Sequence, residues 1–247
     1  MISFRLSPGV KILLGTYFAV FLLQNIVDRW LGGNILGTLG LIPAKFLFEG
    51  AIWQCLTYSL LHADPMHLFL NMAILAFVGT DVELSFGPKK FFLFYFIAVA
   101  FGAASYLMLP VFNVSGTLTQ PLVGASAGIY GLLVVYGVVF GERVMHFMFV
   151  VPMKAKVFVM FLALFELMST AFSSRAAMLS GVAHLGGMLA GVAWLGFEWF
   201  RAGALGAKLF KSQFGLKLRS KPRKSKAKLR IVSSDKDDKE NPPKIWH

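Results

Sequence analysis

The sequence has little charge and almost no cysteine. Among its 247 residues only 15% are charged, and the single cysteine, Cys55, excludes an internal disulfide. No Cys-x-x-Cys pair or Cys/His cluster suggests a zinc site, and we expect no metal and no other cofactor. By contrast, 57% of the residues are hydrophobic. A soluble protein would struggle to hide so much apolar surface, so the composition favours a membrane protein.

Long apolar segments predict six membrane-spanning helices, because a span needs about 20 mainly apolar residues. The segments that meet or approach this length are 11–31, 66–84, 90–110, 124–141, 147–168 and 181–200. The first ends without the small-residue cleavage site of a signal peptide, so we interpret it as a retained span. The predicted fold class is an all-α membrane protein, a bundle of six transmembrane helices.

Basic residues orient this bundle. One set of connections and ends holds Arg5, Lys11, Lys89, Lys90, Arg143, Lys154, Lys156 and everything after Arg201, whereas the opposite set holds only Arg29, Lys45 and Arg175. Because basic loops stay in the cytoplasm, both termini are predicted to be cytoplasmic. The loops at 32–65, 111–123 and 169–180 then face outward.

The C-terminal segment differs in composition from the rest. Residues 201–247 hold 14 of the 24 lysines and arginines but only four acidic residues. We therefore divide the chain into a membrane core, 1–203, and a basic, disordered cytoplasmic tail, 204–247. Anionic lipid headgroups are the expected partner of such a tail next to a span, in preference to nucleic acid.

Polar residues inside the predicted spans are the informative ones, because an intramembrane ionisable group is costly and usually functional or paired. His67 and Asn71 lie four residues apart in the second span, so they share one helix face and can point at a common partner. Hydrogen bonds to neighbouring helices would explain this pair equally well. Glu166, in the fifth span, is given little weight as a deep residue.

Two glycine-rich segments carry a serine and a histidine. Residues 124–131 read GASAGIYG around Ser126, and residues 180–191 read SGVAHLGGMLAG around His184. Small residues let helix backbones approach closely, so these two spans can bring a hydroxyl and an imidazole within hydrogen-bond reach. Both spans run inward from the outer side, as does the span of His67 and Asn71, which gives the four residues similar depth.

These residues together favour acyl transfer. His184 would take the proton from the Ser126 hydroxyl as it attacks a carbonyl. The backbone N–H of Ser126, at a helix N-terminus, and the side chains of His67 and Asn71 would stabilise the oxyanion. No carboxylate is needed if packing fixes the imidazole.

The motifs resemble those of the rhomboid family of intramembrane serine proteases. HADPMHLFLNM contains the His-x-x-x-Asn segment at His67 and Asn71, with His62 five residues earlier, and GASAGIYG and VAHLGGMLAG resemble the serine and Ala-His-x-x-Gly motifs. The resemblance covers about 50–200. It implies a Ser126–His184 dyad without an aspartate in a water-filled cavity, with His67 and Asn71 at the oxyanion.

The same resemblance implies supporting roles. Tyr130 is similar to the aromatic residue that stacks on the catalytic histidine, and Glu83 to a glutamate that follows the second span. Gly124 and Gly128 belong to the serine motif, and His62, with Asp64 and the outer loop, would wet the cavity. The segment FMFVVPMKAK before the fifth span would help a lateral gate to open. Substrates would be single-span membrane proteins, cut where their helix unwinds.

One position departs from the family pattern. Family members often carry Trp-Arg in the first outer loop, whereas this chain has Trp53-Gln54. Trp53 would remain an interface anchor. We expect the arginine's hydrogen bonds to be lost and the loop or its lipid contact to be altered, without loss of catalysis.

Three alternatives compete with an active protease. They are a catalytically inactive rhomboid-like protein that binds membrane clients, a transporter or channel lined by His67, Asn71 and His184, and a zinc hydrolase that uses His62 and His67. The first would lack the serine or the histidine, and the second would show internal repeats, which the sequence lacks. The size and layout of the chain favour a bacterial cytoplasmic membrane.

Overall fold

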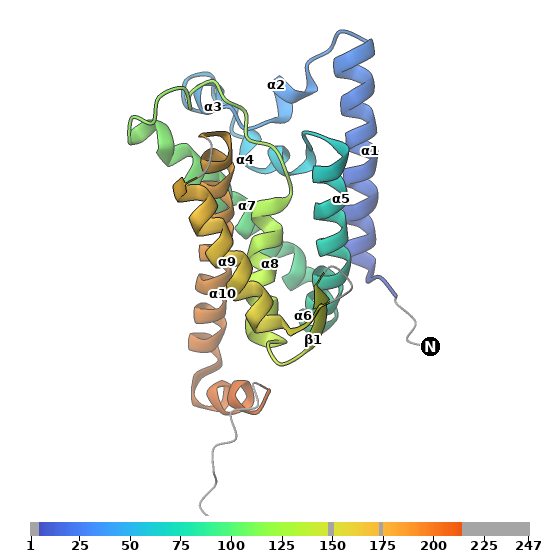
Figure 1. Ribbon diagram of the computed structural model, residues 1–247, viewed down its shortest axis with the longest axis vertical. Coiled ribbons are helices and arrows are strands. Elements are labelled where there is room, and N and C mark those ends of the chain that lie inside the picture. Colours follow the sequence, from blue (N-terminus) through green and yellow to red (C-terminus); the bar gives the residue numbers. More distant parts are fainter. Residues whose placement is uncertain (1–4, 148–150, 173–174, 214–247) are drawn as a thin grey trace, which may run out of the picture. The chain divides into compact units, whose positions relative to one another are not determined.

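The computed structural model describes residues 5–147, 151–172 and 175–213, and this part of the chain is almost entirely helical (Figure 1). In chain order its elements are α1 (Pro8–Trp30), α2 (Ile35–Leu39), α3 (Pro43–Glu49), α4 (Gln54–Thr57), the 3₁₀ turn η1 (Tyr58–Leu60), α5 (Pro65–Ile74), the π turn η2 (Leu75–Gly79), α6 (Thr80–Phe86), α7 (Pro88–Val111), α8 (Ser126–Val139), β1 (Val144–Phe147), β2 (Val151–Lys154), α9 (Ala155–Phe172) and α10 (Arg175–Gln213).

Five stretches of helix are long and apolar enough to cross a membrane. They are Pro8–Trp30, Pro65–Phe86, Pro88–Val111, Ala155–Phe172 and Met178–Arg201. The second of them joins α5, η2 and α6 end to end. A mostly helical membrane protein is thereby confirmed, whereas the cytoplasmic placement of both termini stays a prediction.

Helix α8 is shorter than the predicted fourth span, 124–141. Its 14 residues extend for about 21 Å at 1.5 Å per residue, against about 30 Å of hydrocarbon in a bilayer. The count of six spans therefore stays a prediction. The irregular chain before α8 is held by protein, since Leu122 pairs with Leu41 and the Gly124 N–H donates to the Tyr58 carbonyl. Such backbone is tolerated at membrane depth only where protein or a water-filled cavity covers it.

The predicted fifth span, 147–168, begins too early. Its first described residues are the end of β1 and the whole of β2, which pair antiparallel, with Val144 opposite Lys154 and Phe147 opposite Val151. The β-branched valines suit strands, and Pro152 lacks the N–H that a helix interior needs. Helix α9 accordingly begins at Ala155. Whether FMFVVPMKAK forms a gate stays a prediction, and residues 148–150 lie outside the described residues.

The predicted core and tail meet at a break in α10. Gly203 has φ 54° and ψ −157°, values outside the helical region, and the helix resumes after it to Gln213. Residues 214–247 lie outside the described residues. The division at 203/204 and the disorder of the tail therefore stay predictions, although 204–213 are helical here.

Proline marks the first turn of four helices: Pro8, Pro43, Pro65 and Pro88 each begin one. Proline is favoured there because its fixed φ suits the helix and its missing N–H would have no intrahelical partner. Gly87, at φ 80°, provides the left-handed turn between α6 and α7.

Helix α8 lies among the other helices, packed against α5, α6, α7, α9 and α10 (Figure 1). Its buried side chains are almost all small or aliphatic, and several are fully enclosed. A residue at its first turn can therefore be reached from α5 on one side and from α10 on the other.

Glu83 fastens α1 to α6. One carboxylate oxygen accepts the Gly9 N–H at 2.8 Å, and the other accepts the Val10 N–H at 2.9 Å and the Ser7 hydroxyl. The carboxylate thus caps the N-terminus of α1, where the helix dipole favours negative charge. The sequence assigned Glu83 a supporting role by resemblance, and its partners are the first residues of the chain's first long helix.

Replacing Glu83 is expected to destabilise the bundle. Glu83→Gln keeps one carbonyl oxygen for three donors and turns an amide N–H₂ toward them, so we expect a loss of about 2–4 kcal/mol. The measurement is thermal or chaotrope unfolding in mild detergent. Asp81→Asn is the matched control on the same helix. Asp81 pairs with Arg143 near the surface, and such pairs contribute under about 1 kcal/mol. Equal losses from both variants would contradict the capping role.

Candidate active site

Ser126 and His184 are brought into direct contact. Ser126 is the first residue of α8 and His184 lies in α10, 58 positions later in the sequence. Their Oγ and Nε2 atoms are 2.7 Å apart. This distance is within the hydrogen-bond range required of a nucleophile and its general base.

Glycines allow this contact by letting the two backbones approach. A Cβ added at Gly187 would lie 2.0 Å from the Ala127 carbonyl oxygen, and one added at Gly191 would lie 2.8 Å from that of Gly131. Neither helix has room for a side chain at these crossings. The close approach expected from the small residues is therefore present, and it places His184 beside the first turn of α8.

Gly128 allows α8 to pack closely against α7. A Cβ there would lie 2.5 Å from the ring of Tyr95, on α7. The Tyr95 hydroxyl is 2.6 Å from that of Tyr17, on α1, and also donates to the Ala125 carbonyl at 3.3 Å. The glycines of GASAGIYG thus fit α8 against helices on two sides.

His67 lies next to the serine across Gly124. A Cβ added at Gly124 would be 2.7 Å from Cε1 of His67 and 3.5 Å from Oγ of Ser126, so the imidazole and the hydroxyl flank one point. Gly124 has φ 122°, a conformation that favours glycine. The backbone N–H of His67 donates to Asp64, which caps α5 and fixes this turn.

Asn71 supplies a buried donor without a partner. It lies one turn after His67 on α5 and is buried, and its Nδ2 makes no hydrogen bond within the described part of the chain. A buried amide left unpaired costs free energy unless something else, such as a ligand, satisfies it. The backbone N–H of Ser126, at the start of α8, belongs to the helix-end donors that have no intrahelical partner.

Tyr130 stacks on His184. The two rings are nearly parallel, at 16°, with centroids 4.6 Å apart. The sequence predicted this contact through the family resemblance. The Tyr130 hydroxyl also donates a 2.7 Å hydrogen bond to Oε2 of Glu166 on α9, which the sequence did not predict.

Glu166 is the site residue to which the sequence gave too little weight. Its Oε1 lies 2.7 Å from Nδ1 of His184, so a carboxylate contacts the imidazole on the side away from Ser126. The signal was present in the sequence, since an ionisable residue inside an apolar span is rarely without a function or a partner. No spacing between 126, 166 and 184 could reveal the contact.

His62 is fully buried, and its predicted role in wetting the cavity stays a prediction. Its ring packs edge-on between Tyr17 and His67, at centroid distances of 5.5 and 5.2 Å, and its side chain is 0% exposed. Burial, together with repulsion from a protonated His67, lowers the pKa of His62 to about 4. A neutral, buried imidazole thus packs against the ring of His67.

Gln54 is hydrogen-bonded to the backbone of the segment between α1 and α5. The Gln54 side chain is 0% exposed, accepts the Ile42 N–H and donates to the Thr38 carbonyl, to which the Trp53 indole also donates at 2.9 Å. Gln54 thus makes hydrogen bonds of its own, and the expected loss of the arginine's hydrogen bonds stays a prediction. The shorter glutamine reaches the loop backbone because α4 lies directly against α2.

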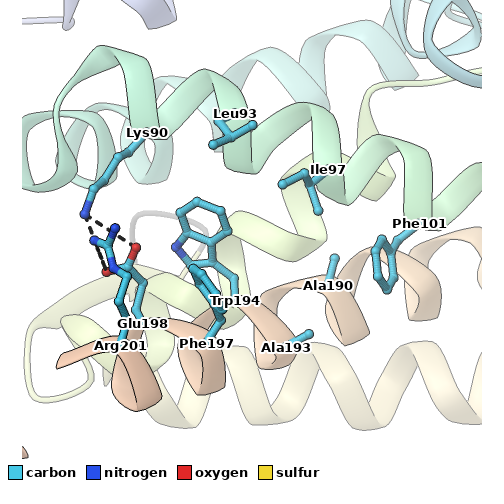
Figure 2. A pocket seen from close by; sticks show the side chains of 10 residues that line it. All are labelled: Lys90, Leu93, Ile97, Phe101, Ala190, Ala193, Trp194, Phe197, Glu198 and Arg201. Atoms are coloured by element: carbon cyan, nitrogen blue, oxygen red, sulfur yellow. Dashed lines mark hydrogen bonds and ion pairs between the residues drawn. The ribbon is translucent and has the colours of Figure 1, made fainter. Parts of the chain in front are cut away.

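Two further observations concern a possible metal site and a groove. Among the described residues no cluster of three or more His, Cys, Asp or Glu side chains could hold a metal ion. An apolar groove of about 500 Å³ lies between α7 and α10, and Figure 2 shows Glu198 between Lys90 and Arg201 at one end of it. Neither Ser126 nor His184 lines that groove.

Comparison with known proteins identifies the family. A sequence model of the rhomboid domain matches residues 49–199, which is more than half of the chain. The chain belongs to the rhomboid family. The matched stretch includes all the rhomboid motif residues described above, from Trp53 to Gly191.

Individual rhomboid relatives differ in their described activity. The chain is 31% identical to "Rhomboid protease GluP" of Bacillus subtilis (strain 168), over 46% of this chain and 21% of that protein. It is 32% identical to "Inactive RHOMBOID-like protein 8" of Arabidopsis thaliana, over 46% of this chain and 31% of the relative. A third relative, RHOMBOID-like protein 5 of the same plant, is 28% identical over 70% of this chain and 53% of its own length. The chain thus spans from a fifth to about half of these relatives' lengths.

The crossing of α8 and α10 can be tested at one glycine. Gly187→Ala places a methyl group against the Ala127 carbonyl, so we expect a loss of about 1–3 kcal/mol from the strain. Thermal unfolding in detergent measures it. Gly196→Ala is the matched control in the same helix, because a Cβ there meets nothing within 4 Å. It is expected to be neutral or to stabilise by about 0.5–1 kcal/mol. The crossing would not be tight if Gly187→Ala behaved like the control.

Proposed function

We propose that this rhomboid is an intramembrane serine endopeptidase. It hydrolyses peptide bonds of single-span membrane proteins, within or near the bilayer, through Ser126 and His184. The observation that carries the proposal is the 2.7 Å contact between the Ser126 hydroxyl and Nε2 of His184, at the start of a helix beside unpaired donors. Retention of both side chains argues against an inactive client-binding protein, the alternative that the relative named inactive keeps open.

The first half-reaction forms an acyl-enzyme. Nε2 of His184 accepts the hydroxyl proton while Oγ of Ser126 attacks the scissile carbonyl, so the proton of the neutral imidazole must be on Nδ1. When the tetrahedral intermediate collapses, the C–N bond breaks. The imidazolium returns its Nε2 proton to the leaving amine, which departs with the C-terminal part of the substrate.

The intermediate carries a negative oxygen that needs donors. His67 lies across Gly124 from Ser126, the Asn71 amide is an unpaired donor one turn away, and the Ser126 N–H begins a helix. Donors that meet the oxyanion already in place are each worth about 10²–10³ in rate in known enzymes. These three groups are the proposed oxyanion stabilisers.

The second half-reaction needs water. A water molecule gives a proton to Nε2 of His184 as its oxygen attacks the acyl carbon, and the proton then returns to Oγ of Ser126. The substrate's carbonyl must be free of its helical hydrogen bond to react, so the scissile stretch must unwind. Small or helix-breaking residues are therefore the expected preference at the cleavage site.

The surroundings of the enzyme are the lipid bilayer and its membrane-protein substrates. Anionic headgroups next to the last span are the proposed partners of the basic segment 204–247. A bacterial cytoplasmic membrane is the proposed location. Curated relatives come from plants, mammals and a parasite as well as from a bacterium.

Removal of either reacting side chain is expected to abolish activity. In liposomes that contain a model single-span substrate, Ser126→Ala and His184→Ala should each reduce cleavage to background. A fluorophosphonate probe should label the wild type and leave Ser126→Ala unlabelled. Asn71→Ala should lower kcat by about 10²–10³ while labelling persists, because one oxyanion donor is lost.

Ser59→Ala is the control for loss of a buried hydroxyl. The Ser59 hydroxyl donates to the Leu56 carbonyl, three residues earlier, and not to Ser126 or His184. It should retain wild-type cleavage. Cleavage by Ser126→Ala at the wild-type rate would rule out the proposed mechanism, and a wild type that neither cleaves nor labels would favour the inactive client-binding alternative.

A further inference from the structure

Glu166 is unlike the rest of α9. Of this helix only Ala155 and Glu166 are buried, and Glu166 is 7% exposed, between Phe165 at 59% and Leu167 at 48%. An apolar helix in a bilayer gains nothing by turning a carboxylate inward unless that group has partners. The inward position of Glu166 therefore needs an explanation that packing does not supply.

Both oxygens of the Glu166 carboxylate have a polar partner. Oε1 lies 2.7 Å from Nδ1 of His184, and Oε2 accepts the Tyr130 hydroxyl at 2.7 Å. Gly181, one turn before His184, leaves room for the group, because a Cβ there would lie 3.1 Å from Oε1. Three helices thus converge on one carboxylate beside the imidazole.

From this geometry we infer that Glu166 is a positioning residue for His184, so that Ser126, His184 and Glu166 form a triad. The inference rests on the proposed function and deepens it. It differs from the expectation of the sequence, in which a dyad without a carboxylate is held by packing alone. Glu166 acts through the imidazole and touches no reacting atom.

The carboxylate has two effects on the base. By accepting a hydrogen bond from Nδ1–H it selects the tautomer whose Nε2 is free to accept the Ser126 proton. When Nε2 is protonated, the carboxylate faces an imidazolium, whose charge it balances. The Nδ1 proton stays on His184 throughout, and Glu166 is not itself protonated.

Tyr130 completes the arrangement. Its ring fixes the plane of the imidazole by stacking, and its hydroxyl fixes the carboxylate that meets Nδ1. The titratable groups that face His184 in the described residues are Glu166 from α9, Tyr130 from α8 and His67 from α5. On α7, Ser105 and Phe101 lie against Gly186, two residues after His184, and neither of them titrates.

The test is the kinetics of Glu166→Gln in liposomes. The near-isosteric amide keeps the volume and removes the charge, so we expect kcat to fall by about 10²–10⁴ while KM changes less than about threefold. The acid limb of the pH–kcat profile should move to lower pH, because the imidazolium loses its counter-ion. A purely structural clamp between α9 and α10 would lower the melting temperature and leave this profile in place.

Three comparison variants sharpen the result. Glu166→Asp retains the charge on a shorter arm, so it should recover part of kcat and keep the wild-type pH profile. Tyr130→Phe retains the stack and loses one hydrogen bond to the carboxylate, so its loss should stay within about tenfold. Glu198→Gln is the control for removal of a partly buried carboxylate from this bundle, because Glu198 pairs with Lys90 and Arg201 in the groove of Figure 2. It should keep wild-type kcat and pH profile.

A measurement on the unaltered chain covers the case in which Glu166→Gln fails to fold. The measurement is the NMR spectrum of wild-type protein labelled with ¹⁵N-histidine. The Nδ1–H proton of His184 should give a strongly downfield resonance, because it is hydrogen-bonded to a carboxylate. Loss of this resonance in His184→Ala assigns it. Absence of that resonance would overturn the inference.

The outcomes separate the two proposals. A labelled, active wild type whose Glu166→Gln variant has unchanged kcat and pH profile would overturn the positioning role alone. A wild type that neither labels nor cleaves would overturn the proposed function and, with it, the triad. Loss of kcat with a shifted profile and partial recovery in Glu166→Asp would support both.

Discussion

The close approach of α8 and α10 is the contact on which the candidate site depends. At Gly187 the two backbones meet with no space for a methyl group, and at Gly191 the crossing is almost as tight. A wider separation, of the kind that leucine or valine at these positions would impose, would carry His184 out of reach of Ser126. Glycines at the crossing have no side chain, so the two helices can approach until His184 reaches Ser126. This contact is what makes Ser126 a candidate nucleophile.

Polar side chains in a bilayer are stabilised where they form hydrogen bonds with one another. The Ser126 hydroxyl meets the imidazole, the imidazole meets the Glu166 carboxylate, and the carboxylate meets the Tyr130 hydroxyl. This chain of contacts links three helices and fixes the orientation of the His184 imidazole. Asn71 differs, since its amide is buried and unpaired. An unpaired donor one turn from His67 is consistent with the oxyanion role proposed for Asn71.

Much of this site was predictable from the sequence. Six spans were predicted and five stretches of helix are long enough to cross a membrane, while Ser126, His184 and His67 lie close together, with Asn71 one turn after His67. Other features were not predictable in the same way. The strands β1 and β2 take up part of an apolar segment that the sequence assigned to a span, and the Gln54 side chain is hydrogen-bonded to the backbone at Ile42 and Thr38. Glu166 is the clearest case, because its importance depends on two residues in other helices.

The sequence by itself indicated that this is a membrane protein, the approximate positions of most of its long helices and which residues are candidates for the site. Composition and apolar run length decide the first two, and side-chain chemistry in glycine-rich segments indicates the third. Only the tertiary structure decided that a carboxylate of α9 meets the histidine of α10. Helical periodicity relates residues on one helix to a common face, but the depth and rotation of one helix against another are fixed by where side chains and backbones fit. For this chain, those fits bring positions 126, 130, 166 and 184 into mutual contact.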